Sequence, residues 1–474
     1  MKQTASIIST YSADTFGVCS ALFELDGMVV MHDPSGCNST YTTHDEPRWY
    51  DMDSRIYISG LTEYDAIMGD DKKLIREVVE TAVAQQPRFI ALLATPVPTM
   101  VGTDLAAIAK LVEKETGIPC FTLATNSMHF YTLGVSLALG WLAEQVVRVK
   151  NESGSQTSST MLRMVPLPQG GRQGDPYGKK EPMLVSESSL PLRGRGTAPA
   201  VDEACCTCNN KKPLTVGNNA LKINLLGVTP LDFAMNGSEK SMQAWLEREG
   251  FVPGACWARG ATLDEILASG TAAVNLVVST GGLLAARVLE AELGIPYVVG
   301  TPLGSSMQQA LAQAIRLSAA DGKSRLCVGD TAILPTVDNP RRIPLAGLAA
   351  KGHGAVNPPP QKGAWLAIGD SVYMQSLAAA VTAETGNAVQ VICPVETDAA
   401  ILAPSTILAT DEAELEPYLA EAAVIIADPM YQPICPPAAK FVALPHVGFS
   451  GRLRLGDIPN LVEGAAEFIA KELK

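Results

Sequence analysis

The sequence is poor in histidine, in cationic residues and in long apolar runs. Its 474 residues include only five histidines, which argues against a histidine-rich metal site. The net charge of −13 makes its surface poorly suited to nucleic acid. It has no uncharged apolar stretch of roughly 18 residues, and MKQTASIIST lacks the basic start and apolar core of a signal peptide. These absences predict a cytoplasmic protein that binds neither a membrane nor nucleic acid.

Motifs for nucleotide binding and for common hydrolytic chemistry are also missing. There is no G-x-x-x-x-G-K-[ST] phosphate loop, and no G-x-G-x-x-G follows a predicted strand. The H-E-x-x-H motif, the G-x-S-x-G motif and a pair of C-x-x-C motifs are absent too. If ATP or NAD takes part in the chemistry, we therefore expect another protein to bind it.

The chain does contain one structural unit three times. Residues 109–125, 286–302 and 378–394 each begin with a helix, continue with a glycine at the expected left-handed helix end, and finish with an apolar strand. Buried strands without polar alternation are typical of parallel sheets covered by helices on both faces. The sequence therefore predicts an α/β protein with three doubly wound, Rossmann-like domains around a central cleft.

Two irregular stretches set the predicted domain borders. The polar, Gly- and Pro-rich stretch 151–218 interrupts the pattern and is predicted to be a linker or a surface excursion. We expect a first domain over 1–150, a second over 219–320 and a third over 321–474, the third containing another irregular stretch at 339–363.

Small and polar residues follow several of the predicted strands. Ligands of open α/β sheets bind outside the carboxyl ends of the strands, so the turns are expected to converge on one cavity. Ser279, Thr280 and Gly281 form such a turn, whose N–H groups can bind an anion or carboxylate or simply begin a helix. His446 can face the cleft or be a buried, hydrogen-bonded histidine. The turns expected to converge follow residues 278, 369 and 445.

One cysteine, Cys37, stands at the tip of a tight turn, HDPSGCNST, that follows a short apolar strand. A thiol in this setting can ligate a metal, attack a substrate or have no role, whereas most cysteines pack as small apolar residues. The next segment, YTTHDEPRW, contains Glu46 and Arg48 and is predicted to be a solvated loop or part of a docking surface.

The other cysteines are expected to be reduced thiols. Cys19 lies in a predicted helix capped by Ser12 or Asp14, where core packing is favoured over metal ligation. Three cysteines in the polar stretch are predicted to be surface thiols, with metal binding or reaction with oxidants as the alternatives. They are Cys205, Cys206 and Cys208.

The segment ISGLTEYDAIMGDDKKL, together with the HDPSGC turn, resembles component 1 of the nitrogenase superfamily. That family includes the catalytic subunits of nitrogenase, their cofactor-assembly relatives, and reductases of chlorophyll and nickel-tetrapyrrole biosynthesis. The resemblance covers about residues 1–150 and 222–474. The matching residues of the segment are Leu61, Thr62, Glu63, Asp65, Gly69, Lys73 and Leu74.

The resemblance implies an iron–sulfur cluster, but only Cys37 matches one of the family's three cluster cysteines. Ser12 and Pro96 stand near the other two positions. A [4Fe–4S] cluster needs a ligand for each iron. Cys19 can join Cys37, with a symmetric partner chain contributing the same two thiolates. A sister subunit can instead contribute the remaining ligands. In the third alternative the chain binds no cluster.

Departures from the family pattern argue against a molybdenum–iron cofactor. Val278 or Ser279 stands where nitrogenase has its cofactor cysteine, and His446 is offset by about one residue from the cofactor histidine. We therefore do not expect dinitrogen reduction.

Three functions remain. The first is an oxidoreductase subunit, in a homodimer or with a paralogous subunit. A separate ATP-dependent iron–sulfur reductase would supply its electrons, which pass through a cluster to a substrate in the cleft. The second is a non-catalytic scaffold or carrier for a metal cofactor or tetrapyrrole. The third is a cluster-free protein that binds a small ligand.

Overall fold

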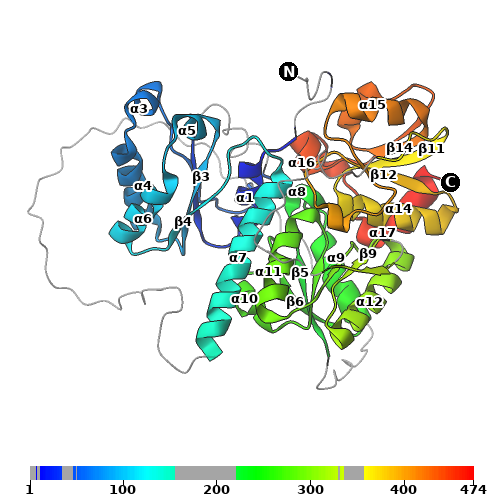
Figure 1. Ribbon diagram of the computed structural model, residues 1–474, viewed down its shortest axis with the longest axis horizontal. Helices are drawn as coiled ribbons and strands as arrows, with labels where there is room; N and C mark the ends of the chain where they lie inside the picture. The colour runs from blue at the N-terminus through cyan, green and yellow to red at the C-terminus, as the bar shows by residue number, and fades with distance from the viewer. Residues whose placement is uncertain are drawn as a thin grey trace, which may run out of the picture. The chain divides into compact units, whose positions relative to one another are not determined.

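The protein is described by a computed structural model, whose described residues fall within one compact unit and form three sheets with flanking helices (Figure 1). The predicted α/β fold class is confirmed. Within the described ranges, no helix is both long and apolar enough to span a lipid bilayer. The structure describes residues 7, 11–34, 46–49, 51–154, 220–328, 331–335 and 357–474.

The first sheet has four parallel strands in the order β2-β1-β3-β4. Successive residues of β1 point to opposite faces, so Val30 packs with Leu74 and Val78 of α4, whereas Val29 packs in the core that contains α1. Both faces of the sheet are therefore covered. The elements are α1 (Asp14–Leu22), β1 (Met28–His32), β2 (Ile56–Ile58), α3 (Glu63–Met68), α4 (Asp71–Gln85), β3 (Ile90–Ala94), α5 (Pro96–Val101), α6 (Leu105–Thr116), β4 (Cys120–Leu123) and α7 (Tyr131–Gly154).

The second sheet has the order β10-β9-β8-β7-β5-β6 and is parallel except for the edge strand β10. Val299 of β8 pairs with Leu326 of β9, so this sheet continues past the border at residue 320 that the sequence suggested. The elements are β5 (Lys222–Leu226), α8 (Pro230–Phe233), α9 (Ser238–Arg248), β6 (Val252–Cys256), α10 (Leu263–Leu267), η2 (Ala268–Thr271), β7 (Val274–Val277), η3 (Thr280–Gly282), α11 (Leu283–Leu293), β8 (Tyr297–Val299), α12 (Gly304–Asp321), β9 (Arg325–Cys327) and β10 (Thr331–Ile333).

The third sheet is parallel throughout, in the order β13-β12-β11-β14-β15. Leu311 of α12 and Leu377 of α14 are buried in the same core, so the second and third sheets share apolar packing. The elements are β11 (Ala364–Ile368), α14 (Ser371–Thr385), β12 (Val389–Cys393), η5 (Ala399–Ile401), β13 (Ile407–Leu408), α15 (Glu412–Glu421), β14 (Ala422–Ala427), η6 (Pro429–Ile434), β15 (Lys440–Ala443), α16 (Val447–Ser450), η7 (Gly451–Asp457) and α17 (Leu461–Glu472).

The three repeated units end their helices as the sequence predicted. Gly117, Gly294 and Gly386 have φ angles of 70°, 68° and 76°, a left-handed conformation that glycine adopts without steric cost. Each cap N–H donates to a carbonyl of the preceding turn, and the chain then enters the next strand.

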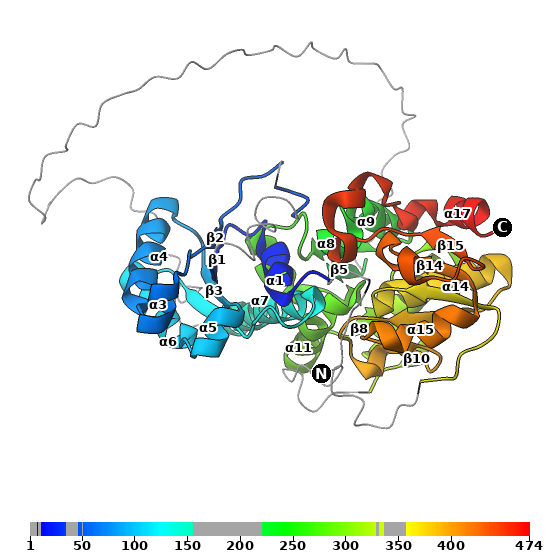
Figure 2. The same cartoon turned by 90° about the horizontal axis from the view of Figure 1, so that it is seen from above.

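Helix α7 packs against α1 on one side and α11 on the other, which connects the first and second sheets (Figures 1 and 2). Glycines allow α1 and α7 to approach closely, because a Cβ atom added at Gly134 would lie 1.7 Å from the carbonyl oxygen of Asp14. The expected side-chain cap of α1 is wrong. The N-cap is Ala13, and the Asp14 carboxylate instead accepts from the N–H groups of Asn126 and Ser127.

Candidate functional site

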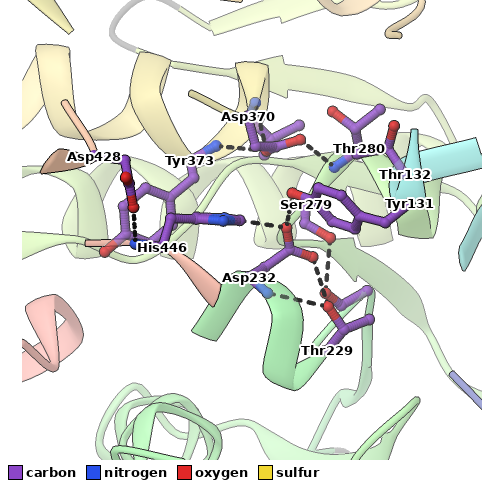
Figure 3. Close-up of polar contacts among 12 residues, drawn as sticks. Tyr131, Thr132, Thr229, Asp232, Ser279, Thr280, Asp370, Tyr373, Asp428 and His446 are labelled. Carbon is purple, nitrogen blue, oxygen red and sulfur yellow. Dashed lines mark hydrogen bonds and ion pairs between the residues drawn. The ribbon is translucent and has the colours of Figure 1, made fainter. Parts of the chain in front are cut away.

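Residues at the carboxyl ends of several parallel strands meet the start of α7 in a buried polar junction (Figure 3). Asp232 follows β5, Thr280 follows β7, Asp370 follows β11 and His446 follows β15, while Tyr131 begins α7. The junction therefore draws on all three sheet regions, and the turns expected to converge do lie together.

Asp232 is the center of the junction. Its Oδ1 accepts from the Tyr131 hydroxyl at 2.7 Å and lies 3.6 Å from Nε2 of His446, and its Oδ2 accepts from the Thr229 hydroxyl at 2.8 Å. Burial, followed by the nearby charge of Asp232, raises the pKa of Tyr131 well above its ordinary value. Tyr131 therefore keeps its proton and acts as a hydrogen-bond donor to the carboxylate.

Asp370 is a second buried carboxyl group at the junction. It caps α14 by accepting from the N–H groups of Val372 and Tyr373, at 3.0 and 3.1 Å, and it accepts from the N–H of Thr280 at 3.2 Å. Burial and, next, the charge of Asp232 raise the pKa of Asp370 to about 6. This carboxyl group can therefore gain or lose a proton near neutral pH.

The turn at 279–281 is already occupied by protein groups. The Thr280 N–H does meet a carboxylate, but that carboxylate belongs to Asp370. The Ser279 hydroxyl donates to the Gly227 carbonyl, and Gly281 packs against Val135 of α7. The turn thus joins two sheets and begins a helix, and the carboxylate that its Thr280 N–H binds is a protein group.

His446 is buried and faces the junction. Its backbone N–H donates to Asp428 at 2.7 Å, and its ring packs against Phe449, with ring centroids 4.5 Å apart. Nδ1 of the ring is buried and has no hydrogen-bond partner among the described residues. His446 is therefore a buried histidine whose backbone N–H is hydrogen-bonded and whose Nε2 lies 3.6 Å from Asp232, at the place where the strands converge.

A small cavity adjoins the junction. It has a volume of about 50 Å³ and shares Thr280 with the junction. Glu396 lies on its wall and forms an ion pair with His129 at 2.7 Å, and burial raises the pKa of Glu396. The wall residues are Thr132, Leu133, Ser136, Thr280, Leu283, Leu284, Arg287, Glu396, Thr397 and Asp398.

Sequence reasoning missed the residues that dominate this site. A cap signal was available for Asp232, because Thr229 followed by a proline after a strand marks a helix start. Asp370 likewise follows a strand and caps a helix. No local signal identified Tyr131 or Glu396.

The described residues do not fit an iron–sulfur cluster. Cys19 is fully buried in the core, and burial raises the pKa of its thiol well above the ordinary value, so it is a protonated packing residue. Pro96 begins α5, and the N–H of Ser12 donates to the Gly448 carbonyl. No group of three metal-ligating side chains is found in the part of the chain that the structure describes. The residues outside that part include Cys37, Cys205, Cys206 and Cys208.

The raised pKa of Asp370 predicts a pH-dependent stability. Its pKa rises from the ordinary value of 3.8 to about 6 on folding, so between these values the folded protein binds the extra proton. The contribution of this proton to the free energy of unfolding is fully present below about pH 4. It is lost as the pH rises through 6, at up to about 1.4 kcal/mol per pH unit. Urea unfolding of the wild type and of Asp370→Asn from pH 4.5 to 7 should show this difference in slope.

A control separates this carboxyl group from the others. Asp232→Asn removes the neighbouring charge and should move the transition of Asp370 to lower pH. Parallel pH profiles for the wild type and Asp370→Asn would contradict the assignment.

Comparisons with known proteins agree with this architecture. The family model for nitrogenase component 1 type oxidoreductases matches residues 14–321. The solved structure titled "Nitrogenase Cp1 at pH 6.5" is similar over 100% of this chain and 94% of its own, with 13% identity and a TM-score of 0.59. The structure titled "Nitrogenase Cp1 at pH 5" is similar over 99% and 89% of the two chains, with 14% identity and a TM-score of 0.55. No curated protein sequence matches the chain. The family model spans more than half of the sequence, and the chain belongs to the nitrogenase component 1 type oxidoreductase family.

Proposed function

We propose that the chain is an oxidoreductase subunit that reduces a small substrate beside the junction of Tyr131, Asp232, Asp370 and His446. A separate ATP-dependent iron–sulfur reductase supplies the electrons, since this sequence has no phosphate loop of its own. Family membership supports the reaction class, and the junction supports its location.

The protonation chemistry of the junction carries the proposal. Reductions of small molecules consume protons as well as electrons, and an efficient proton donor has a pKa near the working pH. Asp370, with a pKa of about 6, meets this condition inside a site that is closed to bulk water. The adjacent Asp232 accepts from Tyr131 and lies near His446, so these groups can hold a proton at the site.

A cluster on this chain requires thiolates from outside the described residues. Cys37 is the candidate, and a homodimer or a paralogous subunit has to supply the remaining ligands of a [4Fe–4S] cluster. Val278 and Ser279 stand near the position of the nitrogenase cofactor cysteine. Val278 is buried and the Ser279 hydroxyl donates to the Gly227 carbonyl, which disfavours a cofactor ligand at this position.

Iron analysis tests this part of the proposal. Anaerobically purified wild-type protein should contain iron and acid-labile sulfide, and Cys37→Ala should lose nearly all of both. Cys19→Ala is the matched control, because its thiol lies in the core, and it should keep its iron while losing about 1–2 kcal/mol of stability. Iron that survives Cys37→Ala would exclude Cys37 as a ligand.

A second candidate function is a cluster-free protein that binds a small ligand. The core position of Cys19, and the lack of a metal-ligating group in the described part of the chain, favour it. Iron-free wild-type protein after anaerobic purification would select this function over the first.

A further inference from the structure

A second and larger cavity lies beside the first sheet. It has a volume of about 230 Å³ and is bordered by the end of β1, the residues after β2, the helices α3 and α4, and the turn from α5 to α6 (Figure 2). The segment ISGLTEYDAIMGDDKKL provides most of its wall. None of the wall residues belongs to the junction, so the proposed function makes no use of this cavity.

His32, the last residue of β1, presents a ring nitrogen to the cavity. It lines the wall although only 7% of the residue is exposed. Nδ1 lies 2.8 Å from the Ser59 hydroxyl, which accepts from the Asp33 N–H at 3.1 Å and donates to the Asp33 carbonyl at 3.5 Å. Because that carbonyl takes the one hydroxyl proton, Nδ1 carries the ring proton and Nε2 has a free lone pair. Nε2 has no partner among the described residues and is not enclosed by them.

The His32 ring is uncharged at neutral pH. Burial is the largest influence and lowers the pKa of His32 from its ordinary value of 6.5, although the charges of Asp71, Asp33 and Asp65 act to raise it. The cavity therefore offers a hydrogen-bond acceptor at Nε2, with the Asp71 carboxylate nearby.

Negative charge predominates on the cavity wall, where five carboxylate side chains face a single lysine. Lys73 forms an ion pair with Asp65 at 2.6 Å, and two other carboxylates accept from N–H groups at the starts of α4 and α6. The carboxylates of Asp71 and Glu77 form no hydrogen bond or ion pair within the described ranges. The wall thus attracts cations, and two of its carboxylates are free to bind them.

The two free carboxylates are six residues apart on α4. A helix rises about 1.5 Å per residue, so Asp71 and Glu77 are separated by about 9 Å along its axis. A chain of about five carbon atoms places two ammonium groups within reach of both carboxylates, with hydrogen bonds of about 2.8 Å at each end. Leu61, Leu74 and Val101 provide an apolar wall for its methylene groups.

We propose that this cavity binds an aliphatic diamine. One ammonium group donates to Nε2 of His32 and to Asp71, and the other binds Glu77. An organic cation fits better than a metal ion, because no three metal-ligating side chains come together in the described part of the chain. This site and its ligand lie outside the proposed function.

Isothermal titration calorimetry on the full-length chain tests the proposal, in about 0.15 M salt to screen long-range attraction to the acidic surface. Three probes of matched length are compared: 1,5-diaminopentane, 1-aminopentane and 1,5-pentanediol. The diamine should bind with a Kd on the order of 0.1 mM. The monoamine should bind about tenfold more weakly, and the diol more weakly still. No binding of the diamine, or equal binding of the diamine and the diol, would overturn the proposal.

Variants place the binding in the cavity. Asp71→Asn, at an exposed position, should weaken diamine binding at least about fivefold. His32→Phe keeps a ring but removes Nε2, and it should cause a similar loss, with circular dichroism confirming its fold. Asp53→Asn is the matched control, because it removes the same charge at an exposed position outside the cavity, and it should leave binding unchanged. Equal losses in Asp53→Asn and Asp71→Asn, or unchanged binding in Asp71→Asn, would reject the site even if His32→Phe fails to fold.

Discussion

Replacing Gly134 with alanine is expected to lower the free energy of unfolding by about 3 kcal/mol, because the close crossing of α1 and α7 has no room for a methyl group. The added Cβ would lie 1.7 Å from the carbonyl oxygen of Asp14, and one added at Gly17 would lie 2.0 Å from that of Tyr131. Both clashing atoms belong to the backbone, so a change of side-chain rotamer cannot relieve the clash. Denaturant unfolding followed by circular dichroism measures the loss.

The same substitution should also disturb the candidate site. Helix α7 begins at Tyr131, whose hydroxyl donates a hydrogen bond to Asp232. A shift of α7 away from α1 would therefore move this donor. Gly464→Ala is the matched control, since this helical glycine in α17 has no atom within 4 Å of its added Cβ. It should stabilise the protein by about 0.5–1 kcal/mol. Equal stabilities for the two variants would show that α1 and α7 do not cross as closely as described.

Replacing Arg48 with methionine is expected to cost about 3–5 kcal/mol, the usual loss when one partner of a buried ion pair is removed. The Arg48 side chain is fully buried. Its guanidinium binds Glu46 at 2.6 Å and Glu24 at 2.8 Å, and it donates to the carbonyls of Ser20 and Ala258. The change removes the counter-charge of two carboxylates and the link from α1 to the segment after β6.

An exposed pair gives the control for this prediction. Arg55 lies 3.5 Å from Asp26, and both side chains are partly or largely exposed, so Arg55→Met should cost less than about 1 kcal/mol. Parallel denaturant curves of the two variants make the comparison. A loss for Arg48→Met as small as that for Arg55→Met would indicate that water reaches the Arg48 side chain.

Arg48 also shows where the sequence misled. Glu46 and Arg48 read locally as a solvated loop, because a short run of charged residues near a turn usually faces water. In the folded chain both are buried. Arg48 donates to Glu46, and it also donates to Glu24 and to the carbonyl of Ala258, which lie more than 20 and 200 positions away in the sequence. No local pattern contains that information.

The sequence by itself determined the parallel α/β class, the glycine-terminated helices and the turns that face the junction. These follow from apolar periodicity and backbone preferences, which act over a few residues. Only the tertiary structure decided that β9 extends the second sheet, that Glu46 and Arg48 are buried, and that Asp232 accepts from Tyr131 across 101 positions. The physical reason is that strand order and the burial of a polar group depend on which distant segments pack together. The pKa of Asp370 is raised first by that burial and then by the charge of Asp232, which follows a strand of another sheet.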